Sequence, residues 1–178
     1  MKTYRTHFLQ YIISLSIILF LVSCSAKHDI TSSTKNSKLI PQKSIYIALA
    51  KDGTYNNTIY PGSGSKTSTA LFKSFSMYTN KIEIANQYKP YSAALTQARR
   101  NGAIYFIYPT IFGWEDRATE WSGKPDKISI QIKTIKTNTG IILNSTIIEG
   151  KSAWATLGGD HPEDLLQKPI NDLINSLY

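Results

Sequence analysis

The chain has 178 residues, of which 42% are hydrophobic, 11% aromatic and 18% charged, and its formal net charge is +8. An ordinary apolar content and a single cysteine exclude a collagen-like repeat, a disulfide scaffold and a wholly disordered chain. The length predicts one compact domain that buries enough surface to fold without a metal ion or a disulfide. Because basic proteins often bind nucleic acid or anionic membranes, the position of the charge along the chain decides its meaning.

The first 23 residues have the features of an export signal. Lys2 and Arg5 precede an uncharged run of twelve residues at 11–22. A membrane-spanning helix needs about 20 apolar residues, so this run is too short for one and is typical of the hydrophobic region of a signal peptide. We therefore expect the chain to be exported and residues 1–23 to be removed.

The signal ends in Leu-Val-Ser-Cys at 21–24, which contains the only cysteine of the chain. This motif resembles the lipobox of bacterial lipoproteins, in which the cysteine carries diacylglycerol and becomes the acylated mature amino terminus. The resemblance implies that Cys24 is lipidated, with palmitate or similar chains, and holds the protein in a lipid bilayer. Ser25 stands where inner-membrane retention typically uses Asp, so the resemblance favours the outer membrane, facing the periplasm. The alternative is a cysteine that ends an ordinary signal peptide by chance.

Residues 24–43 are predicted to form the lipidated cysteine and a flexible tether, because this polar segment has only three sizeable apolar side chains. The folded domain is expected at 44–178. The signal carries a charge of +2, the tether +3 and the domain +3. Most of the basic charge therefore lies outside the domain, where it can meet anionic lipid or stay solvated, and we expect no nucleic-acid partner.

The first half of the domain alternates strands with helices. Residues 44–50 predict a strand, 51–65 a long loop with three glycines, and 69–78 a helix with an apolar face. A strand at 81–86 and a helix from Pro90 to Gly102, with Ala94, Leu95 and Ala98 on its inner face, come next. The continuous apolar run at 103–110 predicts a strand that is buried on both faces.

The second half predicts an antiparallel hairpin and a final helix. Strands at 126–137 and 141–148 are joined by the Asn-Thr-Gly loop at 138–140. The helix begins at Pro162, restarts or bends near Pro169, and carries an apolar stripe formed by Ile170, Leu173, Ile174 and Leu177. The order β-α-β-α-β-β-β-α predicts an α/β fold, with helices packed on a single mixed parallel and antiparallel sheet of about five strands.

One loop, at 114–126, attracts a functional interpretation. It contains two of the three tryptophans and four acidic residues, and it lies between two strands of a rigid scaffold. As a binding site for an envelope protein or for peptidoglycan it would use Trp114, Glu115, Asp116, Arg117, Glu120 and Trp121.

Two other interpretations of this loop stay open. In a cell-wall hydrolase, two carboxylates from Glu115, Asp116, Glu120 and Asp126 would act as acid and base, and the tryptophans would form a sugar platform. In a purely structural loop, Asp116 and Glu120 would pair with Arg117 and Lys124, the tryptophans would cover the sheet edge and Asp126 would start a strand.

The apolar strand at 103–110, the loop sequence Trp-Glu-Asp-Arg-Ala-Thr-Glu-Trp-Ser-Gly and the segment Pro-Glu-Asp-Leu-Leu at 162–166 carry a resemblance. They are similar to a family of small proteobacterial lipoproteins, known as a domain of unknown function, over residues 44–177. The family has no established activity, so the resemblance implies no catalytic residue. Its element order also resembles the N-terminal domain of TolB and periplasmic lipoprotein cofactors of cell-wall synthases, and such a likeness concerns the fold alone.

Other catalytic signatures are incomplete. The Gly-Ser-Gly-Ser-Lys-Thr segment at 62–67 lacks the glycine that a Walker loop places directly before lysine. His7, His28 and His161 are too isolated to predict a metal site, and His161 is expected to cap the helix that begins at Pro162. We expect no cofactor and no enzymatic activity.

Overall fold

The computed structural model of the protein describes residues 27–32, 37–117, 124–152 and 161–178. The signal peptide, the lipobox and Cys24 lie outside these residues, so the prediction of a lipid anchor stays a prediction. Between residues 24 and 43, the described parts of the expected tether are 27–32 and 37–43. No helix in the described ranges is long and apolar enough to cross a membrane.

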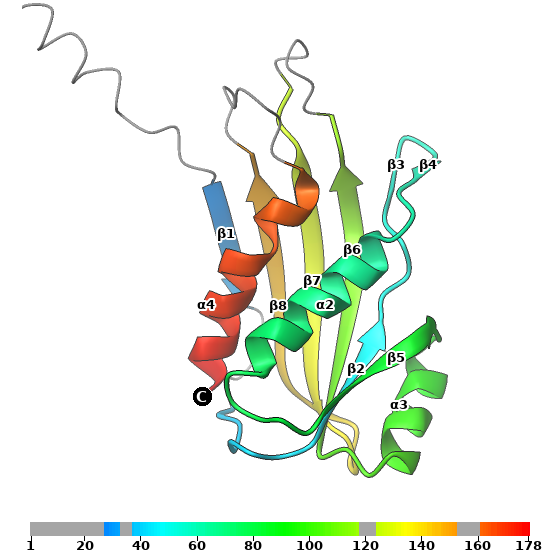
Figure 1. The fold of residues 1–178 in the computed structure, drawn as a ribbon, viewed down its shortest axis with the longest axis vertical. Coiled ribbons are helices and arrows are strands. Elements are labelled where there is room, and N and C mark those ends of the chain that lie inside the picture. The colour runs from blue at the N-terminus through cyan, green and yellow to red at the C-terminus, as the bar shows by residue number, and fades with distance from the viewer. Residues whose placement is uncertain (1–26, 33–36, 118–123, 153–160) are drawn as a thin grey trace, which may run out of the picture.

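The fold is a six-stranded mixed sheet with helices on both faces (Figure 1). The sheet order is β1-β8-β7-β6-β2-β5; β2 runs parallel to β5 and β6, and the remaining neighbours are antiparallel. The elements are β1 (Lys27–Ser32), β2 (Ile45–Leu49), β3 (Thr54–Tyr55), β4 (Thr58–Ile59), α2 (Ser63–Phe75), β5 (Ile82–Tyr88), α3 (Tyr91–Arg100), β6 (Tyr105–Glu115), β7 (Lys127–Lys136), β8 (Ile141–Lys151), the 3-10 helix η1 (Pro162–Leu165) and α4 (Gln167–Leu177).

The structure confirms the α/β class and the mixed sheet, but the prediction of about five strands is wrong. The sixth strand in the sheet is β1, which pairs antiparallel with β8 from Lys27 opposite Lys151 to Ser32 opposite Thr146. Residues 27–32 fall in the expected tether, and that expectation is corrected for this segment. A polar edge strand is stabilised by backbone hydrogen bonds to its neighbour, which leave no hydrophobic pattern in the sequence.

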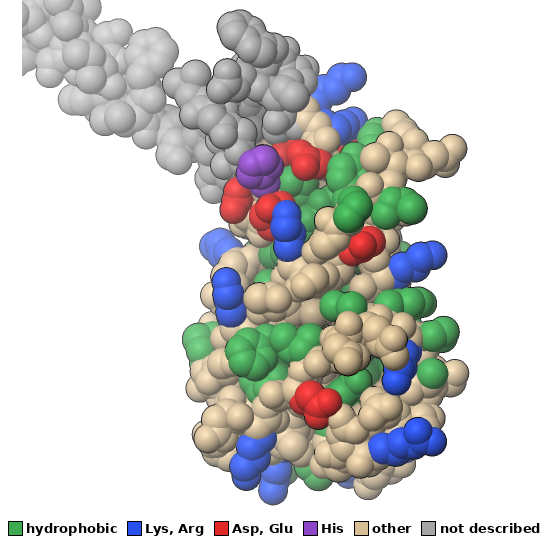
Figure 2. Space-filling model, turned by 45° about the vertical axis from the view of Figure 1, so that its right-hand side comes forward, with side chains coloured by type: hydrophobic (Ala, Val, Ile, Leu, Met, Phe, Trp, Pro, Cys, Tyr) green, Lys and Arg blue, Asp and Glu red, His purple; other side chains and the backbone are tan. Residues whose placement is uncertain are grey.

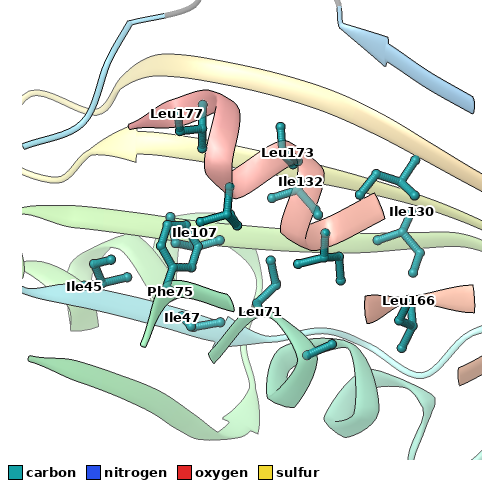
Figure 3. Close-up of a cluster of buried hydrophobic side chains, with 14 of the residues drawn as sticks. Ile45, Ile47, Leu71, Phe75, Ile107, Ile130, Ile132, Leu166, Leu173 and Leu177 are labelled. Carbon is teal, nitrogen blue, oxygen red and sulfur yellow. The ribbon is translucent and has the colours of Figure 1, made fainter. Parts of the chain in front are cut away.

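The main core lies between the sheet and the two helices α2 and α4. Figure 3 shows Leu71 and Phe75 of α2 and Leu173 and Leu177 of α4 beside isoleucines of β2, β6 and β7. The predicted stripe on α4 is buried, as expected. A smaller cluster, with Tyr46, Leu95 and Phe106 among its members, packs between α3 and the opposite face of the sheet.

Helix α2 begins at Ser63, six residues earlier than the sequence predicted. The Asp52 carboxylate accepts a hydrogen bond from the Gly64 N–H at 2.9 Å and so binds the first turn. A Cβ atom at Gly64 would lie 2.2 Å from the Ala50 carbonyl oxygen. The small residues of this segment therefore allow a close approach of the helix to the end of β2, and they explain the glycine-rich sequence without a phosphate site.

Strand β6 is longer than predicted, because it continues through Trp114 and Glu115. Its pairing with β2 covers Tyr105 to Ile107 and ends there. Pro109, which follows, has no N–H to donate, so it suits a point where the two strands separate. Beyond Pro109, β6 remains paired with β7 and also contacts β3.

The last helical segment has two parts, as the sequence predicted. His161 precedes the 3-10 turn η1, and its N–H donates to the Asp164 carboxylate at 3.0 Å. Helix α4 then starts at Gln167 and contains Pro169 in its first turn. A proline is tolerated there, because the first N–H groups of a helix have no partner within the helix.

We predict that the core depends on Phe75. This side chain is fully buried, whereas Phe72, one turn earlier on α2, is 38% exposed. Phe75→Ala is expected to lower the free energy of unfolding by about 3–5 kcal/mol, through lost burial and the cavity that it leaves. Phe72→Ala, the matched control, should cost about 1 kcal/mol or less. Urea unfolding followed by circular dichroism measures both, and equal effects would contradict the proposed packing.

A second prediction concerns the ion pair between α2 and η1. Lys66 Nζ lies 2.5 Å from Glu163 Oε1, and both side chains are partly exposed. Burial would raise the pKa of Glu163, but the hydrogen bond and charge of Lys66 outweigh it and hold this pKa below its ordinary value. A lowered carboxyl pKa stabilises the fold at neutral pH, and the contribution is lost as the pH falls through the folded-state pKa.

Glu163→Gln should therefore reduce stability slightly at about pH 7, by less than about 1 kcal/mol, and leave it unchanged at about pH 3. Lys73→Gln, which changes another lysine of α2, serves as the control and should show no such pH-dependent difference. Urea unfolding at the two pH values measures the effect. A difference between Glu163→Gln and the natural protein that persists at low pH would exclude the ion pair as its cause.

Candidate functional site

The loop at 114–126 joins the upper ends of β6 and β7 in the view of Figure 1. Its first part is the end of β6, and Asp126 directly precedes β7. Residues 118–123, with Glu120 and Trp121, lie outside the described residues. The described ends of the loop show how it is attached to the sheet.

Trp114 belongs to the core and is 2% exposed. A register shift in the pairing of β6 with β7 between Ile111 and Gly113 places Trp114 on the buried face. Gly53 packs against it so closely that a Cβ atom there would lie 2.6 Å from the Trp114 Cβ. The indole therefore stabilises the sheet beneath the segment before β3, in agreement with the structural interpretation, and presents no surface platform.

Arg117 connects the loop to the β3–β4 hairpin (Thr54–Tyr55 and Thr58–Ile59). Its guanidinium group forms an ion pair with Glu115, with 2.5 Å between Nη2 and Oε2. The same group lies 5.2 Å from the centre of the Tyr55 ring and donates to the Tyr55 hydroxyl at 3.2 Å. An arginine over an aromatic face adds a cation–π attraction to the ion pair. Tyr55 gave no functional signal in the sequence, because this contact joins segments about 60 residues apart.

Asp126 closes the other end of the loop and is completely buried. Its carboxylate accepts the Arg117 N–H. Its backbone is bound to Ser152: the Asp126 N–H donates to Ser152 Oγ at 2.9 Å, and the Ser152 N–H donates to the Asp126 carbonyl at 3.0 Å. Asp126 thus ties together the segments that follow β6, precede β7 and follow β8.

The structure thus brings Glu115, Arg117 and Asp126 together, while Asp116 is exposed beside them. Arg117 forms an ion pair with Glu115, a partner that the sequence analysis did not expect, and Glu115, Arg117 and Tyr55 form one group. The expected pairings that involve Glu120 fall outside the described residues and stay predictions. Two of the four carboxylates proposed for hydrolysis are engaged with Arg117. The arrangement attaches the two described ends of the loop firmly to the sheet.

A second feature is a hollow of about 420 Å³ on the face of the sheet opposite α2 and α4. Side chains of four strands line it: Lys27 and Asp29 of β1, Glu149 and Lys151 of β8, Lys127 and Ser129 of β7, and Glu115 of β6. The sequence gave no signal for this hollow, because it requires β1 to join the sheet. Within the described ranges, no group of three or more histidine, cysteine, aspartate or glutamate side chains is placed to hold a metal ion.

Charge is unevenly distributed over the surface. Figure 2 shows acidic side chains gathered next to a histidine at the upper end of one face, where η1 contributes Glu163 and Asp164. Lysines and arginines lie elsewhere on this face, singly or in small groups. The face in this view therefore carries no extended basic stripe of the kind that follows a nucleic-acid backbone.

The sequence matches the family model described as a domain of unknown function (DUF4823) over residues 37–177. The chain belongs to the DUF4823 family. This confirms the expected membership of a family known as a domain of unknown function, while the lipobox and the likeness to TolB stay predictions. The match begins seven residues before the expected domain boundary, in agreement with the burial of Leu39 in the main core. No curated protein matches the DUF4823 chain.

Solved structures resemble this DUF4823 protein at low sequence identity, and PelC shares its fold. The PelC dodecamer from Paraburkholderia phytofirmans has a TM-score of 0.67 and 13% identity, covering 85% of this chain and 97% of that chain. Lipoprotein GNA1162 from Neisseria meningitidis has a TM-score of 0.45 and 15% identity, with 76% and 97% covered. The LpoB C-terminal domain from Escherichia coli has 0.42 and 14%, with 64% and 85% covered.

We predict that Asp126 determines the stability of the loop in this DUF4823 domain. Asp126→Ala would leave the Arg117 N–H without its carboxylate and is expected to cost about 1–3 kcal/mol of unfolding free energy. Asp116→Ala, an exposed neighbour, should change it by less than about 0.5 kcal/mol. Urea unfolding and limited proteolysis between residues 114 and 126 measure the two effects. Equal protease resistance of the two variants would contradict the role given to Asp126.

Proposed function

We propose that the protein is a non-enzymatic lipoprotein of the outer membrane, anchored through Cys24, whose periplasmic domain binds another envelope protein. The observation that carries this proposal is that two of the loop carboxylates are bound to Arg117 at the ends of the loop. Glu115 forms an ion pair with Arg117, and Asp126 is buried and accepts the Arg117 N–H. These contacts fix the two described ends of the loop on the sheet, and binding loops are commonly positioned by a rigid scaffold in this way.

The same contacts argue against a hydrolase that uses these carboxylates. A glycan hydrolase needs an acid and a second carboxylate on opposite sides of the bond that it cleaves, both in contact with the sugar. Asp126 has no exposed surface, so a glycan cannot reach it. Trp114 is also buried, which removes half of the proposed sugar platform.

The likeness to PelC supports an assembling role. PelC with this fold is a dodecamer, and the likeness extends over 97% of its chain. At 13% identity the likeness concerns the fold, so we extend assembly to this protein as part of the proposal. The envelope partner can then be a second copy of this chain.

A photo-crosslinking amino acid at position 116 tests the proposal in cells. Asp116 is exposed at the base of the loop, so a partner bound there should yield a crosslinked species, in which mass spectrometry identifies either an envelope protein or a second copy. The same amino acid at Lys43, which is exposed before β2 at the opposite end of the sheet, is the control and should yield much less product. Absence of a product at position 116 would refute binding through this loop.

Incubation of the purified protein with peptidoglycan provides the enzymatic control. No fragments should be released, because two of the four loop carboxylates, Glu115 and Asp126, are engaged with Arg117. Release that disappears in an Asp116→Asn or Glu115→Gln variant would contradict the non-enzymatic proposal and establish the hydrolase.

A further inference from the structure

Strand β1 places the domain very close to its proposed anchor. The strand starts at Lys27, three residues after Cys24. An extended residue spans at most about 3.6 Å, so the first residue of β1 lies within about 11 Å of the anchoring cysteine. Lys27 is paired with Lys151, the last residue of β8, at the end of the sheet where β6 ends and β7 begins. Acylation of Cys24 would therefore place that end of the sheet at the membrane surface.

Three lysines stand side by side at this end. Lys27 of β1 lies opposite Lys151 of β8, and Lys151 lies opposite Lys127 of β7. All three are exposed and line the hollow on the open face of the sheet. Neighbouring strands are about 4.8 Å apart, so the three side chains leave the sheet as one row about 10 Å long. We call these residues the lysine row.

Glu115 of β6 lies directly opposite Lys127 at the end of the lysine row, but its carboxylate forms an ion pair with Arg117. The described ion pairs of the domain, Lys66–Glu163, Arg117–Glu115 and Lys168–Asp172, include none of its members. Like charges directly opposite on neighbouring strands repel each other. Asp29 and Glu149 form the next row, two residues further from the membrane end. The arrangement therefore gains stability from negative charge supplied from outside the domain, on the side of the anchor.

We propose that the lysine row binds the anionic headgroups of the bilayer that holds the anchor. This inference rests on the proposed lipidation of Cys24 and specifies how the domain is oriented: the lysine row and the loop at 114–126 lie at the membrane, and the opposite end points into the periplasm. The short connection holds the row within reach of lipid phosphates, and lysines near an anionic surface are attracted to it. An orientation of this kind requires no further protein.

Chemical labelling of lysines tests the orientation. The acylated full chain is reconstituted into two kinds of vesicle, anionic vesicles of phosphatidylethanolamine with phosphatidylglycerol and neutral vesicles of phosphatidylcholine alone. Exposed lysines are then acetylated, and mass spectrometry measures the rate of acetylation at each lysine. We expect Lys27, Lys127 and Lys151 to react about fivefold more slowly on the anionic vesicles. This factor corresponds to the attraction of about 1 kcal/mol between one lysine and an anionic surface. Lys43, Lys81 and Lys136, which are exposed at the opposite end of the sheet, should react at equal rates on both.

Matched variants separate the row from charge in general. The double variant Lys127→Gln with Lys151→Gln should abolish the protection of Lys27, whereas Lys81→Gln with Lys136→Gln should leave it intact. Equal labelling of Lys27 on the two kinds of vesicle, or equal protection of the distal lysines, would overturn the proposal.

The mass of the amino-terminal peptide reports the anchor independently. Lipid on Cys24 with unprotected row lysines would refute the lysine row alone. A peptide without lipid would refute the proposed anchor, and the membrane-facing row with it. Cys24→Ser supplies the unlipidated reference for this mass.

Discussion

Pro109 divides the central strand of the sheet, and the architecture of the domain follows from that division. Below it, β6 pairs with β2 and takes part in a parallel sheet covered by α2 and α3. Above it, the strand cannot donate a hydrogen bond at Pro109, β2 turns away, and its pairing continues with β7. The segment from Gly53 to Tyr55 packs against this upper part, with Gly53 against Trp114 and Tyr55 under Arg117. A single residue without an N–H thus marks the point where β6 leaves β2, while the main core continues on both sides of it through Ile107 and Trp114.

The elements that the sequence predicted well are those whose side chains alternate between core and solvent. Ile128, Ile130 and Ile132 of β7 are buried together, and the four stripe residues of α4 are buried with them. The elements that it missed are stabilised by contacts that leave no such pattern. Strand β1 is polar and is held by backbone pairing at an edge, and the start of α2 requires small residues because the helix approaches the Ala50 carbonyl. A sequence rich in glycine and serine therefore indicated a loop where it encodes a close contact.

The loop at 114–126 shows how residue type alone can mislead about a site. Tryptophans and carboxylates together suggested a sugar-binding surface, yet Trp114 is in the core and Asp126 is buried beside Ser152. The shift in register near Gly113 decides which face of the sheet Trp114 occupies, and a shift of one residue exchanges the two faces. The sequence contained no signal for that shift. It did identify Arg117 and its acidic neighbours as a cluster. Which of these acids pairs with Arg117 depends on where β6 ends, and the structure shows that it is Glu115, the last residue of that strand.

The pairing of β1 with β8 also determines how far the domain can move from a lipid anchor. With β1 in the sheet, the fold begins at Lys27, three positions after Cys24. Without it, the first fixed point is Leu39, which is buried in the core and donates its N–H to the Leu177 carbonyl at 2.7 Å. Leu39 lies fifteen positions after Cys24, a span of up to about 50 Å when extended. The same ladder of backbone hydrogen bonds adds Lys27 to the row beside Lys151 and closes one side of the hollow. The membrane position that we propose and the composition of the open face therefore both depend on one edge strand.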